Sequence, residues 1–286
     1  MRDITQSGLR MLGKCEQLYS FRKIERLRAR GGRVPLDIGS AVHHGIEVSS
    51  AEAAADFLRE SAEAAWTSEE KRTIETTAVT VFAMVSGALH LWKEWPSERE
   101  VQFRIPLKNP RTGRSSRAHS FGGKIDGLSP GRVWEFKTAS SIDASYVDRL
   151  EIDYQVSAYM EAASVLQGQP VRHATYRVIK KPGIRKRQKE SIVEFRERIV
   201  NDYRSRPEFY FLEELLTRSE AQMTLWRQEA WEIHKRILAL EAGKLAIRNT
   251  ESCVGRFGRC RFLDLCCGAL DRGSFAVEEK LHPELD

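Results

Sequence analysis

Hydrophobic residues follow two different periods along the chain, and the change of period divides the sequence into three parts. In residues 50–66 and 69–95 apolar side chains recur every three to four positions, which predicts two helices, the second ended by Pro96. Residues 100–107 alternate between apolar and polar side chains instead, as in a strand. Further strands are predicted over 119–128, 132–138 and 171–180, and further helices over 143–167, 191–206 and 219–243. This order predicts an α/β (α+β) fold, a central mixed sheet flanked by helices with helical N- and C-terminal parts.

The composition is typical of a folded protein rather than a disordered or membrane-spanning one. Hydrophobic residues make up 41% and charged residues 30% of the 286 positions. No uncharged apolar run approaches the ~18 residues that cross a bilayer, and the first ten residues contain no apolar stretch of a secretory signal. We therefore expect a cytoplasmic protein with no membrane partner.

The net charge of +6 is small, but the basic residues are concentrated in two stretches. One covers residues 10–33, and the other places six basic side chains among ten residues: Lys180, Lys181, Arg185, Lys186, Arg187 and Lys189. A single basic run is usually a solvated surface. Two such runs in a chain that is otherwise nearly balanced favour a surface that binds phosphates.

Two acidic residues and a lysine occupy neighbouring predicted strands in the middle of the chain. Glu135 and Lys137 are two apart, so they point to one face of their strand while Trp134 and Phe136 point to the other. If the preceding strand pairs with this one, Asp126 lies beside Glu135. Two carboxylates at that distance repel each other unless a cation separates them, and oxygen ligands favour Mg²⁺ or Mn²⁺. An ordinary solvated strand face is the alternative interpretation.

Two further groups can contribute to the same site. His43 lies near the start of a predicted helical stretch, and a neutral imidazole is an additional metal ligand. Gln155 and Tyr159 are four apart, so they share one face of a helix and can both reach a phosphate or a water molecule. A packed histidine and a half-buried tyrosine on a helix flank are the alternatives.

The five cysteines are distributed unevenly. Cys15 stands alone, whereas Cys253, Cys260, Cys266 and Cys267 crowd near the C-terminus. Without a secretory signal a metal site is favoured over disulfides. Four thiolates bind either Zn²⁺ or an iron–sulfur cluster, but zinc sites usually use two closely spaced pairs, and Cys15 has no such neighbour.

Taken in order, these residues resemble the PD-(D/E)XK nuclease superfamily, and more narrowly its RecB/Cas4-type branch. The resemblance covers residues 36–159 through G-x-x-x-H ending at His43, then Asp126, then E-x-K at Glu135 and Lys137, and Q-x-x-x-Y at Gln155 and Tyr159. The proline of the superfamily's name is absent, because Ile125 precedes Asp126.

The resemblance implies a restriction-endonuclease-like core and a metal-dependent deoxyribonuclease. His43, Asp126 and Glu135 would be ligands of Mg²⁺ or Mn²⁺, together with the main-chain carbonyl of Phe136, and Lys137 would be the catalytic lysine. Gln155 and Tyr159 would help to place the substrate. The basic residues Lys180, Lys181, Arg185, Lys186 and Arg187 would contact DNA phosphates.

The resemblance also implies a role for the cysteines. Iron–sulfur members of the branch place one cysteine before the nuclease core and three after it, the last two separated by five residues, as Cys260 and Cys266 are. Cys15, Cys253, Cys260 and Cys266 would then hold a 4Fe-4S cluster, with Cys253 at a longer spacing than usual and Cys267 left over. Zn²⁺ bound by the same thiolates is the alternative.

The expected function is hydrolysis of phosphodiesters by metal-activated water, most simply by an exonuclease on single-stranded DNA or DNA ends in recombination, repair or phage DNA processing. The alternatives are a Cas4-like nuclease that processes CRISPR prespacers and a non-catalytic iron–sulfur DNA-binding protein. No helicase P-loop motif is present, so a helicase, a recombinase or a Cas1-type protein would be a separate partner in a prokaryotic or phage-infected cell. One domain over 1–286 is expected: a nuclease core over 36–182, a helical part over 190–244, and cluster-binding ends over 1–35 and 245–270.

Overall fold

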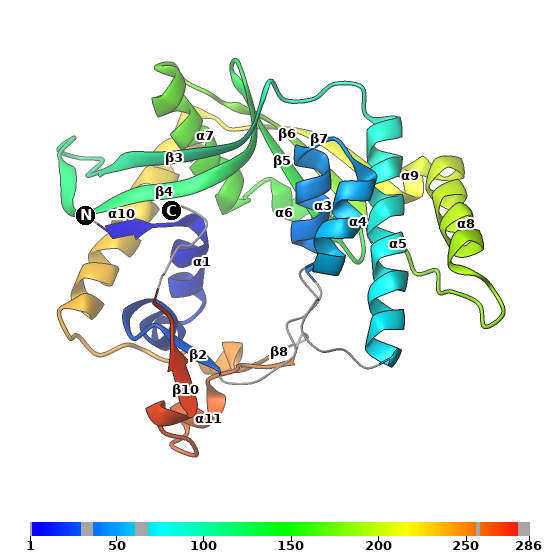
Figure 1. Ribbon diagram of the computed structural model, residues 1–286. Coiled ribbons are helices and arrows are strands. Elements are labelled where there is room, and N and C mark those ends of the chain that lie inside the picture. The colour runs from blue at the N-terminus through cyan, green and yellow to red at the C-terminus, as the bar shows by residue number, and fades with distance from the viewer. Residues whose placement is uncertain (1, 30–36, 61–67, 256–257, 280–286) are drawn as a thin grey trace. The chain divides into compact units, whose positions relative to one another are not determined.

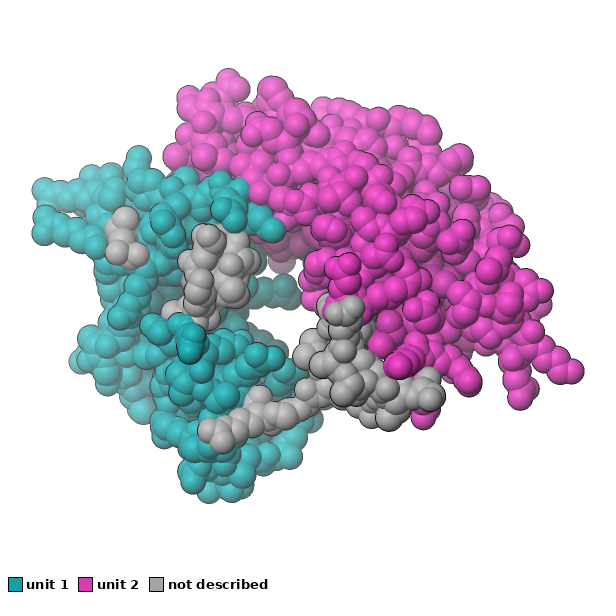
Figure 2. All heavy atoms as spheres, in the orientation of Figure 1, with its two compact units in different colours: residues 1–33, 102–124, 218–286 teal, residues 34–101, 125–217 magenta. Residues whose placement is uncertain are grey.

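The chain forms two compact units, which Figure 2 shows in different colours. The computed structural model describes residues 2–29, 37–60, 68–255 and 258–279. Unit 1 comprises residues 1–33, 102–124 and 218–286, and unit 2 comprises residues 34–101 and 125–217. The expected nuclease core therefore falls largely in unit 2, and both expected cluster-binding ends fall in unit 1.

Unit 2 contains a mixed sheet and its flanking helices, which confirms the expected fold class (Figure 1). The end of β4 (Ser115–Ser129) pairs antiparallel with β5 (Arg132–Ala139), which pairs parallel with β6 (His173–Lys180), which in turn pairs antiparallel with β7 (Phe211–Thr217). The parallel step from β5 to β6 requires a crossover, and α6 (Ala144–Leu150) and α7 (Tyr154–Gln167) supply it. The remaining helices are α3 (Ile38–Glu47), α4 (Ala51–Glu60), α5 (Ser68–Leu91), α8 (Ile192–Ser205) and α9 (Pro207–Tyr210).

The alternation of β5 decides which of its residues form the core and which face the site. Trp134 and Phe136 are buried in a hydrophobic cluster with side chains of α3, α4, α5 and α8. Glu135 and Lys137 consequently share the other face of the strand, as the sequence predicts. One face of the sheet thus stabilises the unit while the other presents charged groups.

Helix α5 is the most apolar long helix among the described residues. An 18-residue window within Lys71–Leu91 has a mean hydropathy of 1.4, so this helix is long and apolar enough to cross a membrane by length and composition alone. Half of that window is buried inside the protein, and α5 packs against α3, α4 and α8. These properties are also those of the central helix of a folded core.

Unit 1 joins the beginning of the chain to its end. Strand β1 (Arg2–Ile4) pairs parallel with the first part of β4, and β2 (Leu27–Ala29) pairs antiparallel with β10 (Phe275–Val277). Between them lie α1 (Gln6–Lys14) and α2 (Glu16–Tyr19), and from the other end of the chain come α10 (Glu220–Glu241), β8 (Val254–Gly255), β9 (Gly258–Arg259) and α11 (Leu263–Cys266). Phe21, Leu27, Phe262 and Phe275 form a small core that holds the two ends together.

Two local differences from the sequence expectation have clear causes. The helix expected over 143–167 is two helices, because the Asp153 side chain accepts a hydrogen bond from the N–H of Val156 and begins α7 there. Strand β7 was not expected, because its sequence FLEELLT lacks regular alternation. Residues 61–66 of the helix expected over 50–66 lie outside the described residues.

Candidate metal centre

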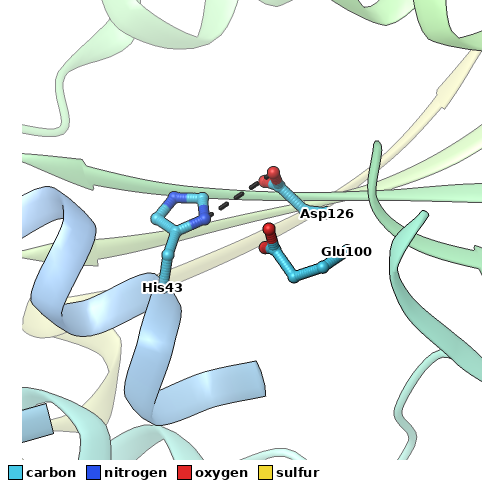
Figure 3. A group of neighbouring side chains, drawn as sticks. All are labelled: His43, Glu100 and Asp126. Carbon is cyan, nitrogen blue, oxygen red and sulfur yellow. Dashed lines mark ion pairs between the residues drawn. The ribbon is translucent and has the colours of Figure 1, made fainter. Parts of the chain in front are cut away.

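Asp126 is held at the centre of the site by the strands around it. Gly127 pairs with Trp134, so the preceding residue, Asp126, comes beside Glu135 as expected. Its Oδ2 accepts a hydrogen bond of 2.8 Å from the N–H of Phe136, which fixes the carboxylate in place. Its Oδ1 lies 3.6 Å from Nδ1 of His43 on α3, and this ion pair is the dashed line in Figure 3. The structure therefore brings together two of the three side chains predicted to bind the metal.

Glu100 completes this group, and sequence reasoning missed it. One ligand atom each from His43, Glu100 and Asp126 lies within 4.8 Å of the other two (Figure 3). Glu100 is near the start of β3 (Glu98–Lys108) and has a positive backbone φ of 52°. The alternation of β3 identifies Glu100 as a polar position but gives no sign that its backbone would turn toward α3. Two carboxylates and an imidazole form a ligand set suited to a divalent cation.

Glu135 is the most deeply buried charged group of the site. Its side chain is 1% exposed, and Oε1 forms an ion pair with Nζ of Lys137. Its Oε2 is buried and finds no hydrogen-bond partner among the described residues. A buried carboxylate oxygen without a partner is costly, and a cation beside Asp126 would remove that cost. The arrangement therefore fits a divalent ion, although Glu135 is not one of the three residues whose ligand atoms already converge.

The charges of Glu135 and Lys137 depend on each other. Burial, and then the neighbouring Asp126 carboxylate, raise the pKa of Glu135 to about 8. Burial alone would lower the pKa of Lys137, but the carboxylates of Glu135 and Asp126 outweigh it and raise that pKa above its usual value. Lys137 is therefore a permanent cation on the charged face of β5.

Gln155 and Tyr159 meet at this face, as their spacing predicts. The Gln155 Nε2 donates to Oη of Tyr159 over 3.1 Å. Burial, and then Glu135 and Asp126, raise the pKa of Tyr159, so its phenol stays protonated. Tyr176 is a further neighbour that sequence reasoning missed, because it pairs with Glu135 across the parallel strands. No spacing within the sequence signals that pairing.

The four predicted cysteine ligands line one cavity of unit 1. Cys15, Cys253, Cys260 and Cys266 border a cavity of about 390 Å³, whereas exposed Cys267 does not line it. Burial raises the pKa of Cys266, and negative charge on Cys260, Cys15 or Cys253 would raise that pKa further. No three of these sulfurs lie within 4.8 Å of one another among the residues searched.

The predicted DNA-binding residues follow the end of β6. The Lys181 N–H donates to the carbonyl of Ala139 over 2.7 Å, which continues the pairing of β5 and β6. Lys180 lies over the ring of Phe209, with Nζ 3.6 Å from the ring centroid. Arg185, Lys186 and Arg187 line a groove of about 720 Å³ whose other wall is the first half of α5, including Arg72 and a row of threonines.

Comparison with known proteins gives limited information. No protein-family model matches the chain, and no curated protein sequence matches it. Among solved structures, the chain is similar to one described as "Putative exonuclease" from Eubacterium rectale, with 12% identity, a TM-score of 0.46, and coverage of 94% of this chain and 89% of that chain. The function must therefore be argued from the site itself.

Proposed function

We propose that this chain is a metal-dependent deoxyribonuclease of the RecB/Cas4-like branch of the PD-(D/E)XK superfamily. One observation carries the proposal: His43, Glu100 and Asp126 converge beside a buried Glu135 that has an unpartnered oxygen and an ion pair to Lys137. The elements that carry the motif residues support the proposal. The histidine is on a helix, the acidic residues and the lysine are on paired strands, and Gln155 and Tyr159 are on the crossover helix.

Each side chain of the site has a separate role in the proposed hydrolysis of phosphodiesters. Mg²⁺ or Mn²⁺ held by His43, Asp126 and Glu135, with Glu100, would activate water and neutralise phosphate charge. Lys137 remains cationic, so its ammonium group can hold the attacking water or the scissile phosphate. Tyr159 keeps its proton and donates a hydrogen bond to a phosphate oxygen, with Gln155 fixing its orientation.

The groove beside the 181–190 segment is a candidate contact surface for DNA phosphates. Its walls carry Arg72 on α5 and Arg185, Lys186 and Arg187 on the opposite side, with Glu69 as an acidic member. Arginine and lysine bind phosphates without regard to base sequence. We infer that a single strand or a DNA end contacts this groove through its phosphates, without readout of the base sequence.

The four-cysteine cavity is proposed to hold a 4Fe-4S cluster. A single zinc ion with Zn–S bonds of about 2.3 Å brings four sulfurs to within about 3.8 Å of one another, whereas no three of these sulfurs lie within 4.8 Å. A cluster of four irons needs more widely spaced thiolates around a cavity, and Cys15, Cys253, Cys260 and Cys266 all border one cavity of about 390 Å³. The cluster would fasten the beginning of unit 1 to its end and stabilise that unit. All five cysteines are free thiols, which suits a cytoplasmic location.

A nuclease assay on end-labelled single- and double-stranded DNA with Mg²⁺ or Mn²⁺ tests the proposal. The wild type should release products, and Lys137→Ala should reduce the rate by at least a hundredfold while keeping the fold. Lys235→Ala is the control, since Lys235 is an exposed lysine that pairs with Glu232 on α10. Absence of products with any metal would favour a non-catalytic DNA-binding protein, and full activity of Lys137→Ala would refute the role of the lysine.

A further inference from the structure

Arg99 makes an unusual set of contacts at the end of the helix that carries His43. The two hydrogens of its Nη1 are shared among three acceptors, the carbonyls of Ile46 and Glu47 at 2.6 and 2.8 Å and Oγ of Ser49 at 2.6 Å. The last carbonyls of a helix have no partner within it, and a cation near them is favourable. Arg99 therefore closes the C-terminal end of α3, one turn beyond His43.

The residue after Arg99 has the backbone conformation that aims Glu100 at the same helix. In a regular strand Arg99 and Glu100 would point to opposite faces. Here the φ of Glu100 is 52°, a left-handed conformation that non-glycine residues rarely adopt and that is often found at functional sites. Arg99 consequently reaches the end of α3 while the Glu100 carboxylate comes within 4.8 Å of the His43 ligand atom.

The guanidinium group is also connected to the strand that holds Asp126. Its Cζ lies 5.3 Å from the centroid of the Trp95 ring. That ring stacks on Phe136 with a centroid distance of 5.8 Å and an interplanar angle of 19°. The N–H of Phe136 donates to Asp126. A continuous series of contacts thus runs from the end of α3 through Arg99 and Trp95 to Asp126.

We propose that Arg99 is a positioning residue of the metal centre, which holds Glu100 at the distance from His43 and Asp126 that a divalent cation requires. The proposal rests on the proposed function, because it assumes that this group of side chains binds the metal. Arg99 acts through Glu100. It holds the end of α3 against the start of β3, and the left-handed backbone of Glu100 then directs the Glu100 carboxylate toward His43. Arg99 is not itself a metal ligand.

The test measures Mn²⁺ binding to the full chain by calorimetry without DNA. Arg99→Met keeps the aliphatic stem and removes all three hydrogen bonds, so the Kd should rise at least tenfold. Arg99→Lys should stay within threefold of the wild type, because one nitrogen makes all three bonds. In a Glu100→Gln background, Arg99→Met should cause no further loss, as expected for a residue that acts through Glu100.

Arg132→Met is the matched control. Arg132 also lies over a tryptophan ring, Trp134, at 5.6 Å, but its ion pair, at 3.1 Å, is with Glu94 rather than a bond to the end of α3. Its Mn²⁺ affinity should remain within twofold of the wild type. Circular dichroism establishes whether each variant is folded. If Arg99→Met is not folded, Ser49→Ala replaces it, because it removes one of the three bonds. Ser49→Ala should weaken Mn²⁺ binding two- to fivefold, and only when Glu100 is present.

The outcomes separate this inference from the proposed function. The positioning role is overturned if folded Arg99→Met binds Mn²⁺ as tightly as the wild type, or if it loses the same affinity with and without Glu100. In either case the proposed function stands as long as the wild type binds metal and cleaves DNA. A wild type that binds no Mn²⁺ and cleaves no DNA overturns both.

Discussion

Glu135 should make metal binding depend on pH in a range where few side chains titrate. Burial and then Asp126 raise its pKa to about 8, and a carboxylate favours a nearby divalent cation only when it is ionised. With that pKa, about a tenth of the side chains are ionised at pH 7 and about nine tenths at pH 9. We therefore expect the Kd for Mg²⁺ to fall on the order of tenfold from pH 7 to pH 9.

Calorimetry in two buffers of different ionisation enthalpy measures both the Kd and the protons released on binding. Release should approach about 0.9 proton per Mg²⁺ at pH 7 and about 0.1 at pH 9. Glu135→Gln provides the control, because it removes the titrating carboxyl and keeps a side chain of nearly the same shape. Whatever Mg²⁺ binding remains in that variant should not change between pH 7 and pH 9.

Two results would refute this reasoning. A constant Mg²⁺ affinity without proton release would mean that Lys137 keeps Glu135 ionised and that burial does not control its charge. The same pH dependence in wild type and Glu135→Gln would assign the proton to another group.

Three further predictions concern separate parts of the chain. Asp126→Asn should abolish Mg²⁺ binding in calorimetry while the protein stays folded, because it removes a charged ligand but keeps an oxygen that can accept the hydrogen bond from the N–H of Phe136; binding at the wild-type affinity would contradict this. Cys15→Ser should remove the iron and the absorbance near 400 nm of anaerobically purified protein, whereas Cys267→Ser should retain both, and equal iron contents would exclude Cys15 as a ligand. Replacing the three basic residues of 185–187 by glutamine should reduce the salt-dependence slope of single-stranded DNA binding by about 2, whereas the same change of the three arginines in 111–117 should not; equal effects would indicate a response to net charge alone.

The sequence predicts the charged strand well because strand periodicity is simple. Trp134 and Phe136 must share one face, and Glu135 and Lys137 the other, whatever the details of packing. The position of Asp126 follows once its strand pairs with β5. Local spacing likewise predicts the contact between Gln155 and Tyr159.

The contributions of Glu100 and Tyr176 could not be obtained in this way, since both depend on the backbone path or on pairing between distant segments. Glu100 reaches the site through a left-handed residue, and no pattern in residues 98–108 requires one. Tyr176 lies beside Glu135 through a parallel pairing across a crossover of two helices. The gathering of Cys15 with the C-terminal cysteines was inferred from resemblance and chemistry rather than from periodicity, and it depends on a small core between the two ends of unit 1.

The same features that make the metal centre suitable for a cation oppose folding in the absence of one. The folded pKa of Glu135, about 8, lies above its ordinary value of 4.5, so its ionisation opposes folding, and stability should decline as pH rises from about 4.5 to about 8. A bound divalent cation reverses this, because it favours the ionised form and binds only the folded chain. The positive φ of Glu100 adds backbone strain, which also opposes folding. Stabilisation of unit 2 by Mg²⁺ should therefore be larger at pH 8 than at pH 6, and this increase should disappear in Glu135→Gln.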